Sequence, residues 1–444
     1  MKVVVVGGSA AGLTAASTIK RRKPEARVMV FEKSGDVSYG ACAMPYNLLQ
    51  KDKPPESLYA LTYKEITEVR GIDYRLYSEV LSIEPQKGRV VVYDRENSRK
   101  YIEEYDYLVY ATGALANRLP LRGFDLPNAF YFKTLDDLRR VKKFIYEENP
   151  KMACLIGAGF INLELADVFK ELGMDVVVLE KMDRILPSYE PEIRQKAEEY
   201  LKEKGVVVVT SVEVNSFDGS AVDTSMGRVP CDFVVAAVGV RPNGEIIREA
   251  GGEIGYKGAV KVNSYLETNL DNVFAAGDCA EHYVRVLDRN LYMPLGTTAN
   301  KQGRIVGHNI AFPNGKKPFY GINQTSVFKI FDYTVGATGL FTRQLDEEGI
   351  SWGKSVVDVR TRGAYPGGGK MRVCLLFEKG SGRLLGCQII GEDVVAKRLD
   401  VAAAAIYAGL TVFELAELDL SYAPPYSPVW DPLLVAANQA VKAV

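Results

Sequence analysis

Two segments of the chain share one pattern, and this pattern restricts the fold more than any other feature. The first, "KVVVVGGSAAGLTAASTIKRRKPEARVMVFEK", has an apolar run, a small-residue turn, an Ala-rich stretch and a second apolar run that ends in Glu32. The second, "KMACLIGAGFINLELADVFKELGMDVVVLEK", repeats the plan and ends in Glu180. Such apolar runs are typical of strands buried on both faces of a parallel sheet. The repeat predicts two nucleotide-binding domains of the α/β class.

The turn of the first unit carries a phosphate-binding fingerprint. It reads Gly7-x-Ser9-x-x-Gly12. Gly7 suits the tight turn and Gly12 allows close helix–strand packing, while the small Ser9 takes the place of the middle glycine. The N–H groups at the start of the following helix would hold a pyrophosphate. Glu32 stands at the distance along the chain that is expected for an acid bound to an adenosine ribose.

The turn of the second unit has Gly157 and Gly159 in the first two glycine places and an asparagine in the third. Glu180 again ends the unit. A carboxylate at this place favours NADH, because it repels the extra 2′-phosphate of NADPH. Lys181 and Arg184 follow closely, so the sequence leaves NADPH possible.

Composition and charge restrict the class of protein. The 444 residues are 47% hydrophobic and 25% charged, which is typical of a globular protein with two or three domains. The net charge of −1 argues against a general nucleic-acid binder. No apolar run reaches the length of a membrane span, and a strand begins within two residues of Met1, so we expect a cytoplasmic protein. The six cysteines are scattered without a C-x-x-C pair, which makes a metal site or a disulfide scaffold a poor expectation.

The pattern changes from about Tyr320 onward. Short apolar runs, "RVCLLFE" and "LLGCQIIG", precede an Ala-rich helix predicted over 394–408 and a tail rich in Pro and Tyr. This order predicts an α+β domain with antiparallel strands.

Five motifs taken together resemble a known family. They are "GGSAAG" with Glu32, "ATG" at 111–113, "GAGFIN" with Glu180, "VGVRPN" at 238–243 and "AAGDCA" at 275–280. The combination is similar to the pyridine nucleotide-disulfide oxidoreductase family of flavoproteins. The resemblance implies FAD in the first dinucleotide fold, NADH or NADPH in the second, and a third domain that forms a homodimer.

The resemblance also implies domains and cofactor residues. We expect an FAD-binding domain in two parts (1–115 and 247–319), an NAD(P)H-binding domain (116–246) and a dimerisation domain (320–444). The residues implied at the FAD are Gly7, Ser9, Gly12, Glu32, Ala111, Thr112, Gly113, Gly277, Asp278, Thr298 and Ala299. Those implied at the nicotinamide nucleotide are Gly157, Gly159, Glu180 and Gly239.

The surroundings of Cys42 distinguish the branches of this family. The branch with a redox disulfide has two cysteines five residues apart, but Val37 and Asn47 occupy those places here. The branch of NADH peroxidases and oxidases carries a His in the first Gly-rich loop, where this chain has Ala10. The only histidines, His282 and His308, receive no role.

A third branch, coenzyme A disulfide reductase, has a single Cys in the setting S-x-x-x-C-x-x-P-Y, and this chain matches it from Ser38 to Tyr46. Ala43 departs from the Gly that usually follows the Cys. The tail "LSYAPPYSPVWDPLLVAANQA" and the stretch "RGAYPGGGK" resemble the segments that bring active-site tyrosines to the Cys of the other subunit. The catalytic residues implied are Cys42, Tyr365, Tyr422 and Tyr426. The alternative for the tyrosines is packing at the dimer interface.

Cys42 also has a local reason to be reactive. Pro45 suits the first turn of a helix, which would place the sulfur near the positive end of the helix dipole and lower the pKa of the thiol. The dipole alone contributes about 0.3–1 kcal/mol, so a further group must help, and an oxidised flavin is the obvious one. A buried, inert thiol is the alternative.

These observations predict a flavoprotein that passes electrons from NAD(P)H through FAD and Cys42 to coenzyme A disulfide, or to coenzyme A persulfide or polysulfide. Arg21 and Arg22 would hold substrate phosphates and Ser38 would line the site, although basic residues at a helix end are also an ordinary solvated face. One alternative is an NADH oxidase that reduces oxygen mainly to hydrogen peroxide. Another is a redox-sensing or partner-binding flavoprotein.

Overall fold

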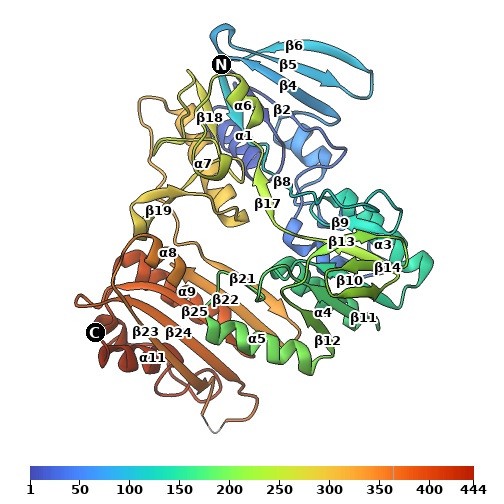
Figure 1. Ribbon diagram of the computed structural model, residues 1–444. Helices are drawn as coiled ribbons and strands as arrows, with labels where there is room; N and C mark the ends of the chain where they lie inside the picture. The colour runs from blue at the N-terminus through green and yellow to red at the C-terminus, as the bar shows by residue number, and fades with distance from the viewer. Residues whose placement is uncertain (364) are drawn as a thin grey trace.

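The computed structural model describes residues 1–363 and 365–444, and it has three parts (Figure 1). The first part, at the top, combines the N-terminal segment with a later segment that contains α7. The second, on the right, follows from the middle of the chain, and the third, at the lower left, ends at the C-terminus. Within the described ranges no helix is long and apolar enough to cross a membrane.

A five-stranded parallel sheet forms the centre of the first part. Its order is β18 (Val273–Ala275), β7 (Tyr107–Tyr110), β1 (Lys2–Val6), β2 (Arg27–Phe31) and β3 (Asp73–Arg75). The four valines of β1 are buried, as expected for a strand covered on both faces. Helices α1 (Ala10–Arg22) and α7 (Gly296–Ala311) pack together along their length. A small antiparallel sheet of β4 (Ser78–Glu84), β5 (Arg89–Asp94) and β6 (Arg99–Glu104) lies at the outer end.

The second part repeats this architecture. Its parallel sheet has the order β12 (Val206–Val209), β11 (Asp175–Leu179), β10 (Met152–Ile156), β16 (Phe233–Ala236) and β9 (Ala129–Tyr131). The helices of this part are α3 (Leu135–Glu148), α4 (Phe160–Glu171) and α5 (Pro191–Glu203). An antiparallel sheet of β13 (Val214–Phe217), β14 (Ala221–Thr224) and β15 (Gly227–Pro230) is attached to it.

Two crossing segments join the first and second parts. The strands β8 (Ala114–Ala116) and β17 (Val240–Pro242) pair in antiparallel fashion between them. Helix α6 (Glu245–Glu249) then returns the chain to the first part, followed by the hairpin of β19 (His282–Val284) and β20 (Arg289–Leu291). The chain therefore leaves the first part and re-enters it.

The third part is an antiparallel sheet covered by helices. Its order is β21 (Ser326–Ile330), β22 (Tyr333–Gly339), β25 (Leu384–Gly391), β24 (Lys370–Glu378) and β23 (Trp352–Arg360). Its helices are α8 (Thr342–Glu347), α9 (Val395–Ala408), α10 (Val412–Ala416) and α11 (Pro432–Val441). The predicted fold class, two parallel dinucleotide-binding units followed by an α+β domain, is confirmed. The domain boundaries proposed from the sequence stay a prediction.

Candidate functional site

The first Gly-rich loop lies against the "ATG" segment. Gly7 has a φ of 95°, and a Cβ built on it would lie 2.3 Å from the carbonyl oxygen of Ala111. A side chain at position 7 is therefore excluded by both backbone conformation and space. The carboxylate of Glu32, at the end of β2, accepts the N–H of Gly8 at 3.0 Å. Gly7, Glu32 and Ala111 are thus brought together around one loop.

The Gly277-Asp278 turn closes the same site from the other half of the first part. A Cβ on Gly277, which has a φ of 81°, would lie 2.9 Å from the Cβ of Ala11 in α1. Thr298 and Ala299, in the first turn of α7, are buried close by. One carboxylate oxygen of Asp278, Oδ1, is buried and has no hydrogen-bond partner among the described residues. A hydroxyl-rich ligand would satisfy this oxygen, so the site fits the ribityl chain of FAD.

Two further residues predicted at the flavin, Thr112 and Gly113, lie where the first and second parts meet. The hydroxyl of Thr112 donates to the carbonyl of Asn243 at 2.8 Å, and the N–H of Asn243 donates to the carbonyl of Gly113 at 3.0 Å. The N–H of Asn117 donates to the carbonyl of Gly239 at 3.0 Å. The "ATG" and "VGVRPN" motifs are therefore one connection, in which each segment positions the other.

The second Gly-rich loop shows why its third place tolerates an asparagine. Asn162 is fully buried in α4, and its side-chain Nδ2 donates to the carbonyls of Ile156 and Gly157, each at 2.7 Å. The Asn162 side chain thereby stabilises the turn by hydrogen bonds, whereas a glycine at this place would allow close helix–strand packing. Gly157 has a φ of 97°, and a Cβ on Gly159 would meet no other atom within 4 Å. The carboxylate of Glu180 accepts the N–H of Ala158 at 2.7 Å, in parallel with Glu32 at the first loop.

Cys42 differs from every other cysteine in its exposure. It lies in a short 3-10 helix (Ala41–Ala43) just before α2 (Met44–Asn47) and is exposed, while the other five cysteines are buried. All six thiols are free. Ser38, four residues earlier, is buried, and its carbonyl accepts the N–H of Ala60 at 2.8 Å. Cys42 is thus the one thiol of the chain that a solute can reach.

Helix α3 holds the segment that follows Cys42. The buried ammonium of Lys142 donates to the carbonyls of Asn47, Gln50 and Lys53 and to the side-chain oxygen of Asn47, at 2.5–3.0 Å. The hydroxyl of Tyr146 donates to the carbonyl of Leu48 at 2.7 Å. Helix α3 of the second part therefore holds the C-terminal end of α2 and the residues that follow it.

The segment that precedes Cys42 is held by the same helix. Arg139 of α3 forms an ion pair with the buried Asp36, with Nη1 donating to Oδ2 at 3.0 Å. Asp36 also accepts the hydroxyl of Tyr59 at 2.7 Å. The N–H of Leu135 donates to the hydroxyl of Tyr39 at 3.2 Å. The loop that carries Cys42 is therefore clamped on both sides.

The electrostatics around Cys42 correct one expectation. Although Cys42 is exposed, the surrounding protein partly buries its sulfur, and this burial raises the pKa of the thiol. The carboxylates of Glu164 and Asp278 raise it further. The ammonium of Lys133 opposes them and lowers the pKa. The prediction that the helix start lowers this pKa is wrong for the groups of the chain, because burial of the sulfur and the nearby carboxylates outweigh a helix of only four residues.

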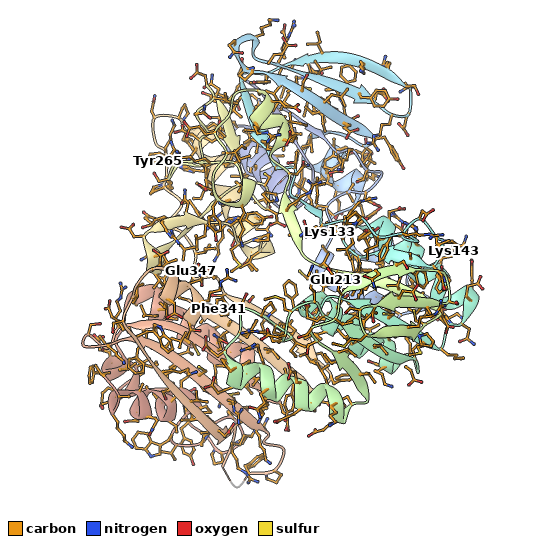
Figure 2. The ribbon with its side chains drawn as sticks, viewed as in Figure 1. Lys133, Lys143, Glu213, Tyr265, Phe341 and Glu347 are labelled. Carbon is orange, nitrogen blue, oxygen red and sulfur yellow. The ribbon has the colours of Figure 1, made fainter. Side chains whose placement is uncertain are left out.

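Two residues that the sequence analysis missed flank the thiol. Glu164 of α4 accepts the hydroxyl of Tyr46 at 2.7 Å, and burial raises the pKa of Glu164 to about 7. Lys133 lies between the first and second parts, as Figure 2 shows. Burial raises the pKa of both Cys42 and Asp278, and the charge of Lys133 opposes that rise. An acid inside the apolar stretch "FINLELADVF" is a signal that could have revealed Glu164. Nothing in the local pattern distinguishes Lys133.

The three predicted tyrosines all belong to the third part. Tyr365, Tyr422 and Tyr426 are 47%, 53% and 74% exposed. The segments that carry Tyr365 and Tyr426 are tied to the buried Arg398 of α9, whose Nε donates to Asp431 at 2.8 Å and whose Nη2 donates to the carbonyl of Thr361 at 3.2 Å. The structure therefore fixes the backbone near two of the tyrosines and leaves all three side chains exposed.

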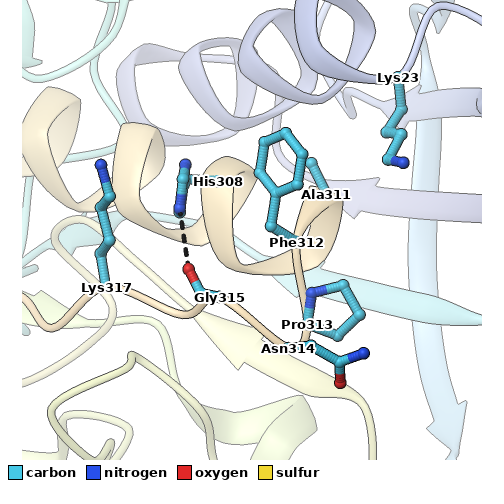
Figure 3. Close-up of a pocket in the computed structure, with 8 residues that line it drawn as sticks. All are labelled: Lys23, His308, Ala311, Phe312, Pro313, Asn314, Gly315 and Lys317. Atoms are coloured by element: carbon cyan, nitrogen blue, oxygen red, sulfur yellow. Dashed lines mark hydrogen bonds between the residues drawn. The ribbon is translucent and has the colours of Figure 1, made fainter.

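Basic residues follow the exposed side of α1. Arg21 and Arg22 are exposed at its end, and Nη1 of Arg70 donates to the hydroxyl of Ser17, one turn before Arg21, at 2.7 Å. Beyond this end lies an open pocket of about 470 Å³ between the ends of α1 and α7 (Figure 3). Its lining comprises Lys23, His308, Ala311, Phe312, Pro313, Asn314, Gly315 and Lys317.

The two histidines lie at different places, and His308 alone of the two lines the pocket. His282 is fully buried in β19, where its Nδ1 accepts the N–H of Met293 at 3.2 Å. Burial lowers the pKa of His282 to about 4, so the ring is neutral. His308 lies near the end of α7 and contacts the carbonyl of Gly315 at 3.1 Å.

Curated proteins of similar length match the whole chain. An NADH oxidase of Methanocaldococcus jannaschii is 34% identical over 100% of this chain and 99% of its own. A protein of Pyrococcus horikoshii named NAD(P)H coenzyme A polysulfide/persulfide reductase is 34% identical over 98% of both chains. A coenzyme A disulfide reductase of Staphylococcus aureus is 30% identical over 96% of both chains.

A solved structure and two family descriptions agree with these matches. The NAD-dependent persulfide reductase of A. fulgidus superposes with a TM-score of 0.95 at 37% identity, covering 100% of this chain and 83% of the other. Residues 1–303 match the family described as pyridine nucleotide-disulphide oxidoreductase, and residues 325–432 match its dimerisation domain. The family uses FAD and NAD(P)H, which the two Gly-rich loops and Asp278 fit. This chain therefore belongs to the pyridine nucleotide-disulphide oxidoreductase family and is an oxidoreductase.

Proposed function

We propose that this protein uses NAD(P)H to reduce coenzyme A disulfide, or coenzyme A persulfide or polysulfide, through FAD and Cys42. The observation that carries the proposal is the isolation of one accessible thiol. Cys42 is exposed and free, and the other five cysteines are buried. A cysteine that works without a protein partner must take its second sulfur from the substrate.

The sulfur chemistry then needs only one residue of the chain. The Cys42 thiolate attacks a substrate disulfide, so that one S–S bond breaks, a mixed disulfide forms at Cys42 and a thiolate leaves. Two electrons that originate from NAD(P)H then cleave the mixed disulfide, which releases the second thiol and restores the Cys42 thiolate. Bound FAD supplies the two-electron transfer between nicotinamide and sulfur. Lys133 favours the thiolate throughout, since it lowers the pKa of Cys42.

The leaving thiolate needs a proton, and the tyrosines of the third part are suitable donors. Arg398 ties Asp431, five residues after Tyr426, to Thr361, four residues before Tyr365, while both tyrosine side chains stay exposed. They are free to enter the site of a second copy of the chain, and the match to a dimerisation domain supports this arrangement. A phenol donates well when its partner is a developing thiolate. We propose Tyr426 as the donor, with Tyr365 and Tyr422 beside it.

The basic side of α1 supports a substrate with phosphates. Arg21 lies about 16 Å along α1 from the first Gly-rich loop, at 1.5 Å per residue. Arg70 reaches the same side of the helix through Ser17. Guanidinium groups bind phosphate oxygens with paired hydrogen bonds. We therefore propose that Arg21, Arg22 and Arg70 bind the phosphates of coenzyme A while its sulfur reaches Cys42 near Ser38.

The test is steady-state oxidation of NADH with four acceptors: coenzyme A disulfide, polysulfide, hydrogen peroxide and oxygen. We expect the two sulfur acceptors to be preferred, and we expect Cys42→Ser to abolish their reduction while FAD stays bound. Cys387→Ser is the matched control, because Cys387 is fully buried in β25 of the third part. Full disulfide reduction by Cys42→Ser would show that the single-cysteine mechanism is wrong.

The M. jannaschii relative favours NADH oxidase activity as a second function. The same experiment separates the two. An oxidase retains oxygen consumption in Cys42→Ser, and since Ala10 stands where peroxidases carry a His, we expect the product to be mainly hydrogen peroxide. A redox-sensing flavoprotein would show slow turnover with every acceptor.

A further inference from the structure

The acid at the end of β11 is held in one position. Glu180 uses both carboxylate oxygens: Oε2 accepts the N–H of Ala158 in the Gly-rich loop at 2.7 Å, and Oε1 accepts the N–H of Met182 at 2.8 Å. An acid at this place faces the adenosine ribose of a dinucleotide. The two residues that follow with positive charge, Lys181 and Arg184, are therefore the nearest cations in the sequence to the position of a 2′-phosphate.

Both of these cations are already engaged. The ammonium of Lys181 lies 2.8 Å from Oε1 of Glu213, and the two groups stabilise each other's charge, raising the pKa of Lys181 and lowering that of Glu213. Nη2 of Arg184 donates to Oδ2 of Asp183 at 2.7 Å. Figure 2 labels Glu213 in the second part of the molecule.

The backbone fixes Glu213 opposite this turn. The N–H of Ser211 donates to the carbonyl of Met182 at 2.8 Å, and the N–H of Val212 donates to the carbonyl of Glu180 at 3.0 Å. On its other side, Glu213 exchanges two hydrogen bonds with Ser225: its N–H donates to the hydroxyl at 3.0 Å, and its carbonyl accepts the N–H at 2.8 Å. The main chain at Glu213 is thus tied to two neighbouring segments.

We propose that Glu213 is a specificity-determining residue that favours NADH over NADPH by neutralising Lys181. The turn at 180–184 and the neighbouring residues 211–213 together carry three carboxylates and two cations: Glu180, Asp183, Glu213, Lys181 and Arg184. A 2′-phosphate would have to displace Glu213 from Lys181 and then remain close to two carboxylates. NADH has a neutral 2′-hydroxyl at this place and avoids both costs. The inference concerns only the nicotinamide nucleotide and does not depend on the sulfur substrate.

The expected effect is modest, because both partners of the ion pair are exposed, at 77% and 60%. Because water and salt screen an exposed pair, about fivefold is the largest change in an equilibrium constant that we expect from it. Glu213→Gln keeps the size of the side chain and removes the charge. We therefore expect this variant to raise the preference for NADPH relative to NADH by about fivefold.

Two measurements on the FAD-loaded protein test the proposal. One is the rate of flavin reduction by NADPH and by NADH without an electron acceptor. The other is the dissociation constant of adenosine 2′,5′-bisphosphate compared with that of AMP, by calorimetry. Neither uses a disulfide, so they remain informative even if the sulfur substrate is another one. We expect both ratios to shift toward the 2′-phosphate in Glu213→Gln and to stay unchanged in Glu347→Gln, whose partner Arg343 lies in the third part.

The same substitution is also tested in a Lys181→Ala variant. Because the cation is absent there, adding Glu213→Gln should raise the preference for NADPH relative to NADH by much less than fivefold. An unchanged ratio in Glu213→Gln would overturn the proposal. So would an equal gain with and without Lys181, because Glu213 would then act only as a general negative charge.

Discussion

The segment around Cys42 and the segments that carry the tyrosines are each held by one buried cation, but this cation comes from another part of the molecule in the first case and from the same part in the second. Lys142 of the second part binds the C-terminal end of α2, and Arg398 of the third part binds Asp431 and the carbonyl of Thr361. Around Cys42 the loop is clamped by another part of its own chain. Around the tyrosines only the backbone is fixed, and the side chains remain exposed. The difference agrees with our proposal that Cys42 acts within its own chain and that the tyrosines enter the site of a second copy.

The largest expected effect concerns the clamp on the Cys42 segment. Lys142→Met removes four hydrogen bonds and leaves the carbonyl groups of residues 47, 50 and 53 without a charged donor. We expect the free energy of unfolding to fall by about 3 kcal/mol, because hydrogen bonds from a charged donor to these carbonyls are lost. Urea denaturation measures this change.

The neighbouring lysine provides the control for that variant. Lys143 is 71% exposed and its nearest carboxylate, Glu147, is 3.9 Å away. Lys143→Met should therefore change the free energy of unfolding by less than about 0.5 kcal/mol. Equal effects at the two positions would contradict the clamp.

A somewhat smaller loss is expected at the other buried cation. Asp431→Asn keeps an oxygen that can accept the N–H of Leu433 at the start of α11 but removes the negative charge beside Arg398. We expect a loss of about 2 kcal/mol, below the usual 3–5 kcal/mol for breaking a buried pair, because hydrogen bonding is retained. Turnover should fall while alkylation of Cys42 proceeds at the wild-type rate.

Asp400 offers the matched control, because it is 59% exposed and pairs with Lys397 on the same helix. Asp400→Asn should leave stability and turnover unchanged. If Asp431→Asn also slowed the alkylation of Cys42, the two regions would not be independent within one chain.

Tyr426→Phe tests the proton donor itself. We expect turnover to fall by about tenfold, less than the usual range for a general acid, because Tyr365 and Tyr422 can substitute. Sedimentation should show a dimer at micromolar concentration in both the wild type and the variant. Unchanged turnover in an intact dimer would show that Tyr426 is not the proton donor. A monomeric wild type would contradict the proposal that a second copy of the chain supplies the tyrosines.

The smallest effect is a change in pH dependence at Cys42. Glu164 has a pKa of about 7, so its negative charge forms as the pH rises through neutrality and then opposes the Cys42 thiolate. In Glu164→Gln this opposition is absent, and the pKa of Cys42 is lowered. We expect the midpoint of Cys42 alkylation by iodoacetamide to move to lower pH. A midpoint that moves to higher pH would show that Glu164 acts on Cys42 in another way.

The sequence could predict whatever depends on local pattern. Both acids at the ends of β2 and β11 lie where the spacing indicates, each bound to the second residue of its own loop. The Gly277-Asp278 turn and the antiparallel third part also follow the prediction. Lys133 could not be found in this way, and the sequence marks Glu164 only as an acid inside an apolar stretch, because the effect of both residues on Cys42 results from the packing of the first part on the second. The direction of the Cys42 pKa was misjudged for the same reason.

The central proposal is that Cys42 takes its second sulfur from the substrate. Trapping the mixed disulfide between Cys42 and coenzyme A tests it directly. Protein with oxidised FAD and a free Cys42 thiol is incubated with coenzyme A disulfide in the absence of NADH. It is then digested without reductant and analysed by mass spectrometry. We predict that the peptide containing Cys42 carries the added mass of one coenzyme A and that the five buried cysteines are unmodified. An unmodified Cys42, or a disulfide between Cys42 and another cysteine of the protein, would contradict the account.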